Sequence, residues 1–141
     1  MTNEVRTRRK ARARAVQAVY AWDVLGEEGL ERVAARLWDD IVVGGDVRRR
    51  ALEIVRLVDA RGGEIDGALR DVTTNWRLER LGASERSVLR VAGAELLEGT
   101  TPPKVVIQEA VRLAERFGSE PSARFVNGVV DALARRMGRL S

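Results

Sequence analysis

The sequence contains no cysteine and no histidine. These two absences remove thiol nucleophiles, imidazole bases and the commonest zinc ligands, so most enzyme chemistries lose their usual groups. The sequence also contains neither GxxxxGK[ST] nor GxGxxG, the two glycine-rich patterns that cradle phosphates. We therefore expect a protein without catalysis, cofactor or metal.

Long hydrophobic runs are also missing. No apolar stretch approaches the roughly 20 residues that a membrane-spanning helix needs, and the charged N-terminus is not followed by the apolar segment of a signal peptide. We expect no membrane span and a cytoplasmic location.

Aromatic residues are few, at 4% of the chain, whereas hydrophobic residues make up 45%. The only short β-branched run, 41–43, is ended at once by two glycines. Apolar residues recur instead at intervals of three and four, which predicts an all-α protein of about seven helices. The expected helices span 4–25, 30–38, 47–59, 65–72, 84–97, 104–118 and 124–133, with a short broken turn near 75–81.

The last expected helix has a strong apolar ladder. Phe125, Val129 and Leu133 recur at i, i+4 and i+8, which is typical of a core-facing helix. We expect this helix to be mostly buried and the rest of the molecule to be organised around it. With the helix at 104–118 it should form a hairpin across the short connection 118–121.

Asn127 and Gly128 interrupt that helix with two poor helix formers. The structural interpretation is that Gly128 permits a close approach of two helices and that Asn127 satisfies a buried backbone group. The alternative is that the pair contacts a ligand directly. We favour the structural interpretation.

Positive charge is concentrated near the N-terminus. Six cations lie between residues 6 and 14, whereas the net charge of the whole chain is only +4, so the remainder is net negative. On a helix these side chains cover a broad face, and a polyanion relieves their mutual repulsion. The run therefore predicts nucleic-acid binding, with a solvated basic tail, an acidic membrane or an acidic protein as alternatives. The six are Arg6, Arg8, Arg9, Lys10, Arg12 and Arg14.

Proteins that bind single-stranded RNA usually place aromatic rings among the positive charges, because bases stack on them. Trp22 follows the basic run by two or three turns, and we expect it in the core. Phe125 follows Arg124 at the start of the last helix, where a ring can be partly exposed. Periodicity alone makes Phe125 a core residue.

Two stretches carry a resemblance to a known family. RTRRKARARAVQAVYAWD resembles the N-terminus, and PPKVVIQEAVRLAERFGSEPSARFVNGVVDALAR the C-terminal half, of the NusB family of bacterial transcription antitermination factors. The most specific part is FVNGVVD preceded by KVVIxEA, and the resemblance extends over nearly the whole chain.

The resemblance implies a single all-helical domain of two packed bundles, about 1–75 and 76–141. It also implies binding of the boxA element of ribosomal-RNA leader transcripts, as single-stranded RNA. The expected protein partners are a small-subunit ribosomal protein, called NusE in this role, and the antitermination complex on RNA polymerase. By position it assigns RNA binding to Arg6, Arg8, Arg9, Arg12, Arg124 and Phe125, and partner contact to Tyr20, Glu79 and Glu85.

Other interpretations stay open. A NusB-like module also precedes the catalytic domain of a ribosomal-RNA cytosine methyltransferase, but this sequence ends at Ser141 without a Rossmann-type continuation, so we expect a separate protein. A structural adaptor with an incidental basic tail is a third hypothesis. Apolar residues on the first helix fit either a homodimer seam or a partner groove.

Overall fold

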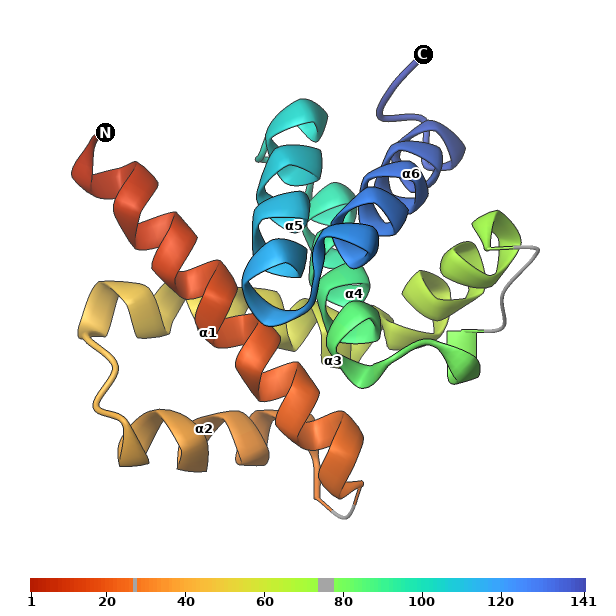
Figure 1. Cartoon of the computed structure of the whole chain (residues 1–141). Coiled ribbons are helices and arrows are strands. Elements are labelled where there is room, and N and C mark those ends of the chain that lie inside the picture. The colour runs from red at the N-terminus through yellow and green to blue at the C-terminus, as the bar shows by residue number, and fades with distance from the viewer. Residues whose placement is uncertain (27, 74–77) are drawn as a thin grey trace.

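The computed structural model describes residues 1–26, 28–73 and 78–141, and within them every regular element is a helix (Figure 1). The prediction of an all-α fold is confirmed. Expected and observed helix ends agree within a few residues except at 59 and 65, where the structure has no helix end. The observed η1 lies in the expected broken turn, whose residues 75–77 are outside the described part. The elements are α1 (Asn3–Leu25), α2 (Leu30–Asp40), α3 (Gly45–Val72), the 3₁₀ helix η1 (Leu78–Arg80), α4 (Ala83–Glu98), α5 (Pro103–Phe117) and α6 (Glu120–Arg136).

Local chemistry sets several helix ends. The Thr2 side chain caps α1 by accepting a hydrogen bond from the backbone of the first turn, and Ser119 does the same for α6. Gly26 ends α1 in the left-handed region at φ 68°, which glycine adopts without a Cβ clash. Pro103 occupies the first turn of α5, where its missing N–H has no helical partner to lose.

The third and fourth expected helices are joined into one element. α3 is continuous from Gly45 to Val72, but Arg61 has non-helical dihedral angles of φ −115° and ψ 18°. Two glycines follow immediately, and glycine is a poor helix former, so a kink at this point is inexpensive. The expected count of about seven therefore becomes six α-helices in the described residues, and the second half of α3 points in a new direction.

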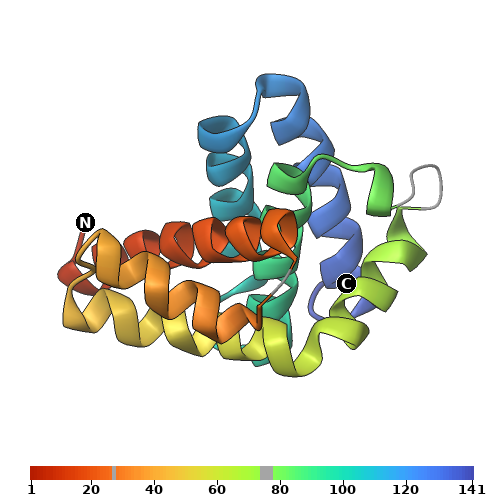
Figure 2. The ribbon, with the colours of Figure 1, turned by 90° about the horizontal axis from the view of Figure 1, so that it is seen from below.

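The helices form two groups in chain order. α1, α2 and the first half of α3 lie side by side, and α4, α5 and α6 stand across them (Figure 2). α4 contacts α1, α3, α5 and α6, and the buried side chains of both groups form one continuous core. The division into two bundles near residue 75 stays a prediction.

The expectation that α6 is mostly buried is wrong, because α4 occupies the centre. Most of α4 from Ser87 to Leu96 is buried on every side. α6 buries one stripe, which includes Val126, Val130 and Leu133, and exposes the opposite side. An amphipathic ladder predicts that a helix has a buried face, but it does not tell how many neighbours cover it.

The structural interpretation of Asn127 and Gly128 is also wrong. Both residues are exposed on α6, and a Cβ built on Gly128 has no atom within 4 Å outside its own helix and chain neighbours. The close approach occurs instead at Gly93 of α4, where an added Cβ would lie 2.8 Å from Cγ2 of Ile65 on α3. Residues 127 and 128 are about 100° and 200° around the helix from buried Val126, which turns them away from α4 and α5.

The C-terminal half of α1 is fastened to α4 by ion pairs. Nε of Arg86 donates to Asp23 at 2.9 Å, and Arg90 makes a two-pronged pair with Asp66 of α3 at 3.0 Å. The Arg90 guanidinium also lies 5.7 Å from the ring centre of Trp22, a cation–π distance. Trp22, expected in the core, is half-buried and packs against the edge of the core.

Candidate nucleic-acid interface

The basic run lies on the N-terminal half of α1, whose alanines at 11, 13, 15 and 18 are buried. Ala11, Ala15 and Ala18 share one side of the helix, and their small side chains let α1 lie close to α3 and α4. The cations between the alanines therefore project in different directions, and each one meets a different environment.

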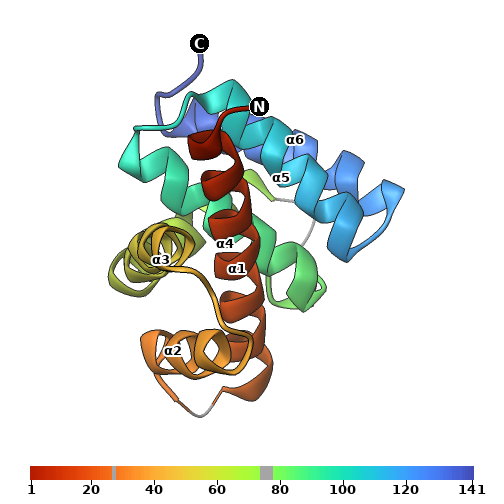
Figure 3. The same ribbon diagram turned by 90° about the vertical axis from the view of Figure 1, so that its left-hand side faces the viewer.

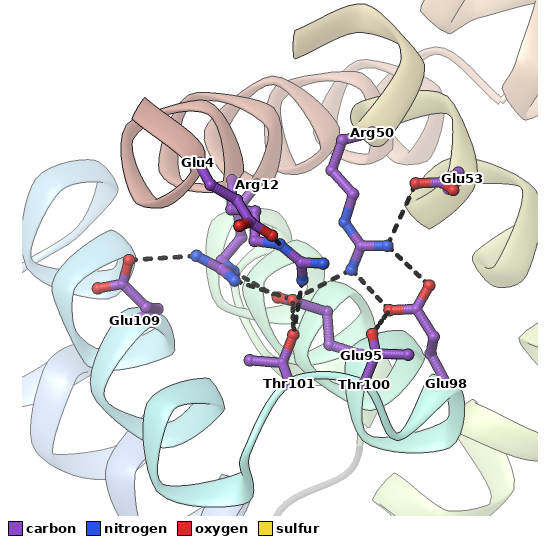
Figure 4. A network of polar contacts seen from close by, with 10 residues as sticks. Glu4, Arg12, Arg50, Glu53, Glu95, Glu98, Thr100, Thr101 and Glu109 are labelled. Carbon is purple, nitrogen blue, oxygen red and sulfur yellow. Dashed lines mark hydrogen bonds and ion pairs between the residues drawn. The ribbon is translucent and has the colours of Figure 1, made fainter. Parts of the chain in front are cut away.

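Arg12 points into the protein, where its side chain is only 6% exposed (Figure 4). Its Nη2 donates to Oε2 of Glu95 at 2.9 Å, its Nε donates to the other oxygen of the same carboxylate, and its Nη1 donates to Oε1 of Glu109 at 3.1 Å. A buried charge is tolerated when it is paired and hydrogen-bonded in this way. With all three nitrogens engaged inside the protein, we expect Arg12 to support the RNA site and not to touch RNA.

Arg50 of α3 extends the buried network. Its two terminal nitrogens donate to Glu98 at 2.7 and 2.6 Å, and Nη2 lies 3.5 Å from Oε2 of Glu95. The hydrogen bond from Arg50 is the largest influence on Glu98 and holds the pKa of that carboxyl below its usual value, although burial opposes the shift. Thr101 donates to the same Oε2 of Glu95 at 3.2 Å. The network therefore joins α1, α3, α4 and the α4–α5 connection.

Arg8 and Arg9 lie at the edge of this network and are partly exposed. Nη1 of Arg8 donates to Thr101 at 3.3 Å, and Nε of Arg9 donates to Oε1 of Glu109 at 2.8 Å. Arg6 is exposed. These three residues keep donors accessible to a ligand, in contrast to Arg12.

A basic groove of about 630 Å³ lies between α1 and α5. Arg9 and Lys10 line it from α1, and Arg112 and Arg116 line it from α5, together with the carboxylates Glu109 and Glu115. Cations outnumber carboxylates in this lining, so the groove is suited to an anionic ligand. We call it the first groove; its lining is Arg9, Lys10, Arg12, Ala13, Glu109, Arg112, Leu113, Glu115 and Arg116.

Sequence reasoning missed the α5 side of the first groove. Arg112 and Arg116 are exposed and spaced i, i+4, on the side of α5 away from its buried stripe of Val106, Ala110 and Leu113. A search for basic pairs at helical spacing would have found them. Arg124 is exposed and Phe125 half-buried, and neither lines the first groove.

The residues expected to contact a protein partner lie elsewhere. Tyr20 is 45% exposed and lines an apolar groove of about 460 Å³ with Ser84 and Phe117. Glu85, next to Ser84, accepts a hydrogen bond from Ser122 at 2.9 Å. Glu79 is exposed and pairs with Arg70 at 2.9 Å. The structure thus brings Tyr20 close to the start of α4, whereas Glu79 is on η1.

Two classes of site are not found in the described residues. Across 1–26, 28–73 and 78–141, no three acidic side chains are grouped so that they could hold a metal ion. No helix in the same residues has the length and apolarity required to cross a membrane.

Comparisons with known proteins agree on one family. The model of the NusB family matches residues 9–135. The transcription antitermination protein NusB of Anaeromyxobacter dehalogenans (strain 2CP-1 / ATCC BAA-258) is 44% identical over 128 residues, which cover 90% of this chain and 89% of that protein. The protein of the same name from Sorangium cellulosum is 39% identical and covers 94% of this chain and 95% of its own length.

Solved structures show the same likeness. NusB of T. maritima superimposes with a TM-score of 0.84 at 32% identity, covering 91% of this chain and 90% of that one. A crystal structure of the antitermination factors NusB and NusE in complex with dsRNA contains a chain with a TM-score of 0.85 at 28% identity, covering 93% and 98%. The chain with the buried Arg12 network and the basic first groove therefore belongs to the NusB family.

Proposed function

We propose that this protein binds the boxA element of ribosomal-RNA leader transcripts as a cytoplasmic antitermination factor. Proteins of the NusB family act in transcription antitermination and are not enzymes. The observation that carries the proposal is the first groove, where exposed cations of α1 and α5 face each other. Relatives matched over about nine-tenths of their length are antitermination proteins, which favours this role over an accessory module of a methyltransferase.

We assign the RNA contacts to those cations whose side chains are exposed or partly exposed and keep donors accessible to a ligand. Arg6, Arg8 and Arg9 bind phosphates from α1, and the first groove adds Lys10, Arg112 and Arg116. Arginine and lysine contacts to phosphate supply affinity and position the strand. Arg124 and the partly exposed ring of Phe125 read bases, because sequence-specific RNA recognition uses stacking and base edges.

A second protein completes the complex. One similar structure contains NusB with NusE and dsRNA, so we propose the ribosomal protein NusE as the partner of this chain and RNA polymerase as the target of the assembly. Tyr20, Glu79 and Glu85 are the contact residues. Self-association through the apolar residues of α1 stays a prediction.

A salt titration tests the RNA contacts. For single strands, the logarithm of affinity falls with the logarithm of salt by about 0.7 for each neutralised phosphate. A variant with Arg6, Arg8 and Arg9 all changed to Ala should lose about two units of slope on boxA-type RNA, and Arg112→Ala should lose about 0.7. Arg56→Ala is the matched control, because Arg56 is an exposed arginine of α3 that pairs with Glu31 at 2.9 Å and lines neither the first groove nor the groove beside Arg8. Unchanged slopes in both test variants would place the RNA site elsewhere.

A separate measurement tests the protein partner. Glu85→Lys should weaken binding to the ribosomal protein, since charge at an interface rim sets association rate and specificity. Glu115→Lys is the control, because Glu115 lies in the first groove and not near Tyr20. If both variants bind the partner with the affinity of the unmodified protein, Glu85 does not belong to the contact.

A further inference from the structure

A second groove crosses α1 beside the first one. Its volume is about 470 Å³, and it lies between α1, the connection from α2 to α3, and the end of α5. Three cations contribute to its lining, and the remaining lining residues are small or aliphatic, with no carboxylate among them. In Figure 3 the α2–α3 connection passes close to α1. The lining is Lys10, Ala13, Arg14, Val42, Val43, Gly44, Val47 and Arg116.

The three cations of the second groove are not neutralised within the described residues. Arg14 donates to the neutral amide of Gln17 at 3.0 Å, and the Arg116 guanidinium lies 5.1 Å from the ring centre of Phe117. Lys10 is exposed and has no carboxylate partner in the part of the chain that the structure describes. Three uncompensated positive charges around one groove favour an anionic ligand.

The arginines in the first turn of α3 show that this is not a general property of the surface. There Arg48 pairs with Asp39 at 2.7 Å, and Arg49 pairs with Asp46 at 3.1 Å. These arginines carry the same charge as those of the second groove, but each has a carboxylate partner on the protein surface. The second groove is thus set apart by the absence of acid in its lining, and not by its number of arginines.

Val42 forms an unusual edge of the second groove. Its backbone is in the left-handed region at φ 53°, which a β-branched side chain rarely adopts, and its side chain is 86% exposed. A strained residue persists where its surroundings determine it, and such residues concentrate at binding sites. The strain here presents an aliphatic side chain to solvent beside three cations.

We propose that the second groove is an additional RNA subsite that takes further nucleotides of the same single strand. The proposal rests on the proposed function and extends its footprint. Both grooves share Lys10, Ala13 and Arg116, so a strand in the first groove has a continuous basic path into the second. That continuity favours RNA over an acidic protein segment as the occupant.

The chemistry of the subsite defines its role. Lys10, Arg14 and Arg116 bind phosphates, and the valines of the α2–α3 connection seat the sugar or base of a nucleotide. The lining has no aromatic ring for stacking and no amide to read a base edge. The subsite therefore adds affinity and dependence on RNA length, and it tolerates any sequence in the added nucleotides.

The test compares two RNA lengths in the absence of protein partners. The probes are a boxA-type oligonucleotide and the same oligonucleotide extended by three nucleotides at each end, with two unrelated extension sequences. The unmodified protein should bind both extended probes several-fold more tightly than the short one. Arg14→Ala should remove that gain and lower the salt slope on the extended probes by about 0.7, with no change on the short probe.

Two further variants keep the result interpretable. Val42→Glu places a negative charge at the exposed edge and should also remove the gain, whereas Arg56→Ala, at an exposed arginine that pairs with Glu31, should retain it. The proposal is overturned if extension brings no gain, if Arg14→Ala weakens short and extended probes equally, or if it leaves RNA binding intact and weakens the ribosomal partner instead. Failure of the proposed function looks different, because the short probe would then show no salt-dependent binding and no response to Arg112→Ala.

Discussion

Arg12 and Lys10 are two residues apart in one basic run, yet they lie in opposite environments. Arg12 is enclosed by Glu95 and Glu109, and Lys10 is exposed between two grooves. A run of like charges on a helix is therefore not one surface. Successive residues of a helix are rotated by about 100°, so neighbouring side chains lie on different sides of it. Which of the charged side chains pair with carboxylates depends on the helices around α1.

The buried ion pairs of Arg12 fix the position of α1. Arg12 contacts carboxylates on both α4 and α5, so it fixes where α1 sits against each of them. The walls of the first groove are α1 and α5. Our hypothesis is that the buried network holds the groove in register, a use of buried ion pairs that is attested in other proteins but is not general.

The largest expected effect separates the two cations directly. Arg12→Ala leaves the buried carboxylate of Glu95 without its two-point partner and leaves Glu109 with Arg9 alone, so it should lower the free energy of unfolding by about 3–5 kcal/mol. Lys10→Ala should change it by less than about 0.5 kcal/mol, because Lys10 is on the surface. Denaturant unfolding followed by circular dichroism measures both. Equal stability of the two variants would contradict the assignment of Arg12 to the interior.

A pair of glycines extends the comparison of inside and outside. Gly93→Ala forces a Cβ against Ile65 and should destabilise the protein by about 1–3 kcal/mol, the usual range for overpacking. Combining it with Ile65→Ala should cost less than the sum of the two single changes, because the clash disappears. Strict additivity would mean that α3 and α4 do not meet at this point.

The exposed glycine should respond in the opposite direction. Gly128→Ala on α6 removes a poor helix former where space is open, so the free energy of unfolding should rise by about 0.5–1 kcal/mol. Thermal unfolding of Gly128→Ala and Gly93→Ala, measured under the same conditions, gives the sign of each change in stability. If Gly128→Ala instead lowers the free energy of unfolding, the added methyl group must meet other atoms in the folded protein, and Gly128 is not in open space.

The smallest expected effect is a pH dependence. The pKa of Glu98 is lowered in the folded protein, chiefly by the hydrogen bond from Arg50, so its contribution to stability is present above the ordinary glutamate pKa of about 4.3. That contribution is lost as pH falls through the lower folded pKa. Between pH 6 and pH 3, the free energy of unfolding should fall less steeply for Glu98→Gln than for the unmodified protein. Glu53→Gln, at an exposed carboxylate, serves as the control.

The two mistaken expectations about α6 share a physical origin. The apolar ladder of Phe125, Val129 and Leu133 indicates a helix with a buried face, and the structure buries Val129 and Leu133 and half-buries Phe125. It could not tell that α4, with a less regular pattern, has neighbours on all sides. Asn127 was taken for a buried amide because it interrupts an apolar stretch, but helical geometry turns it outward.

One wall of the basic first groove could be predicted from the sequence for similar reasons. A concentration of positive charge is visible in one dimension, so the basic half of α1 was found at once. Arg112 and Arg116 are distant in the chain and line the groove only because the fold places α5 across it from α1. The family resemblance assigns RNA binding to Arg12 by its position in the run, and that position does not show that the fold encloses the side chain.

By itself the sequence determined the all-helical class, the positions of most helix ends, the family and the basic character of α1. These properties depend on local propensity, capping and period, which act over one or two turns. Only the tertiary structure decided that α4 is central, that Gly93 is the close contact, and that one arginine of the run is buried while its neighbours line grooves. Those properties depend on which surfaces meet, and a carboxylate about 80 or 100 residues away neutralises a charge only where the fold brings it within hydrogen-bond distance.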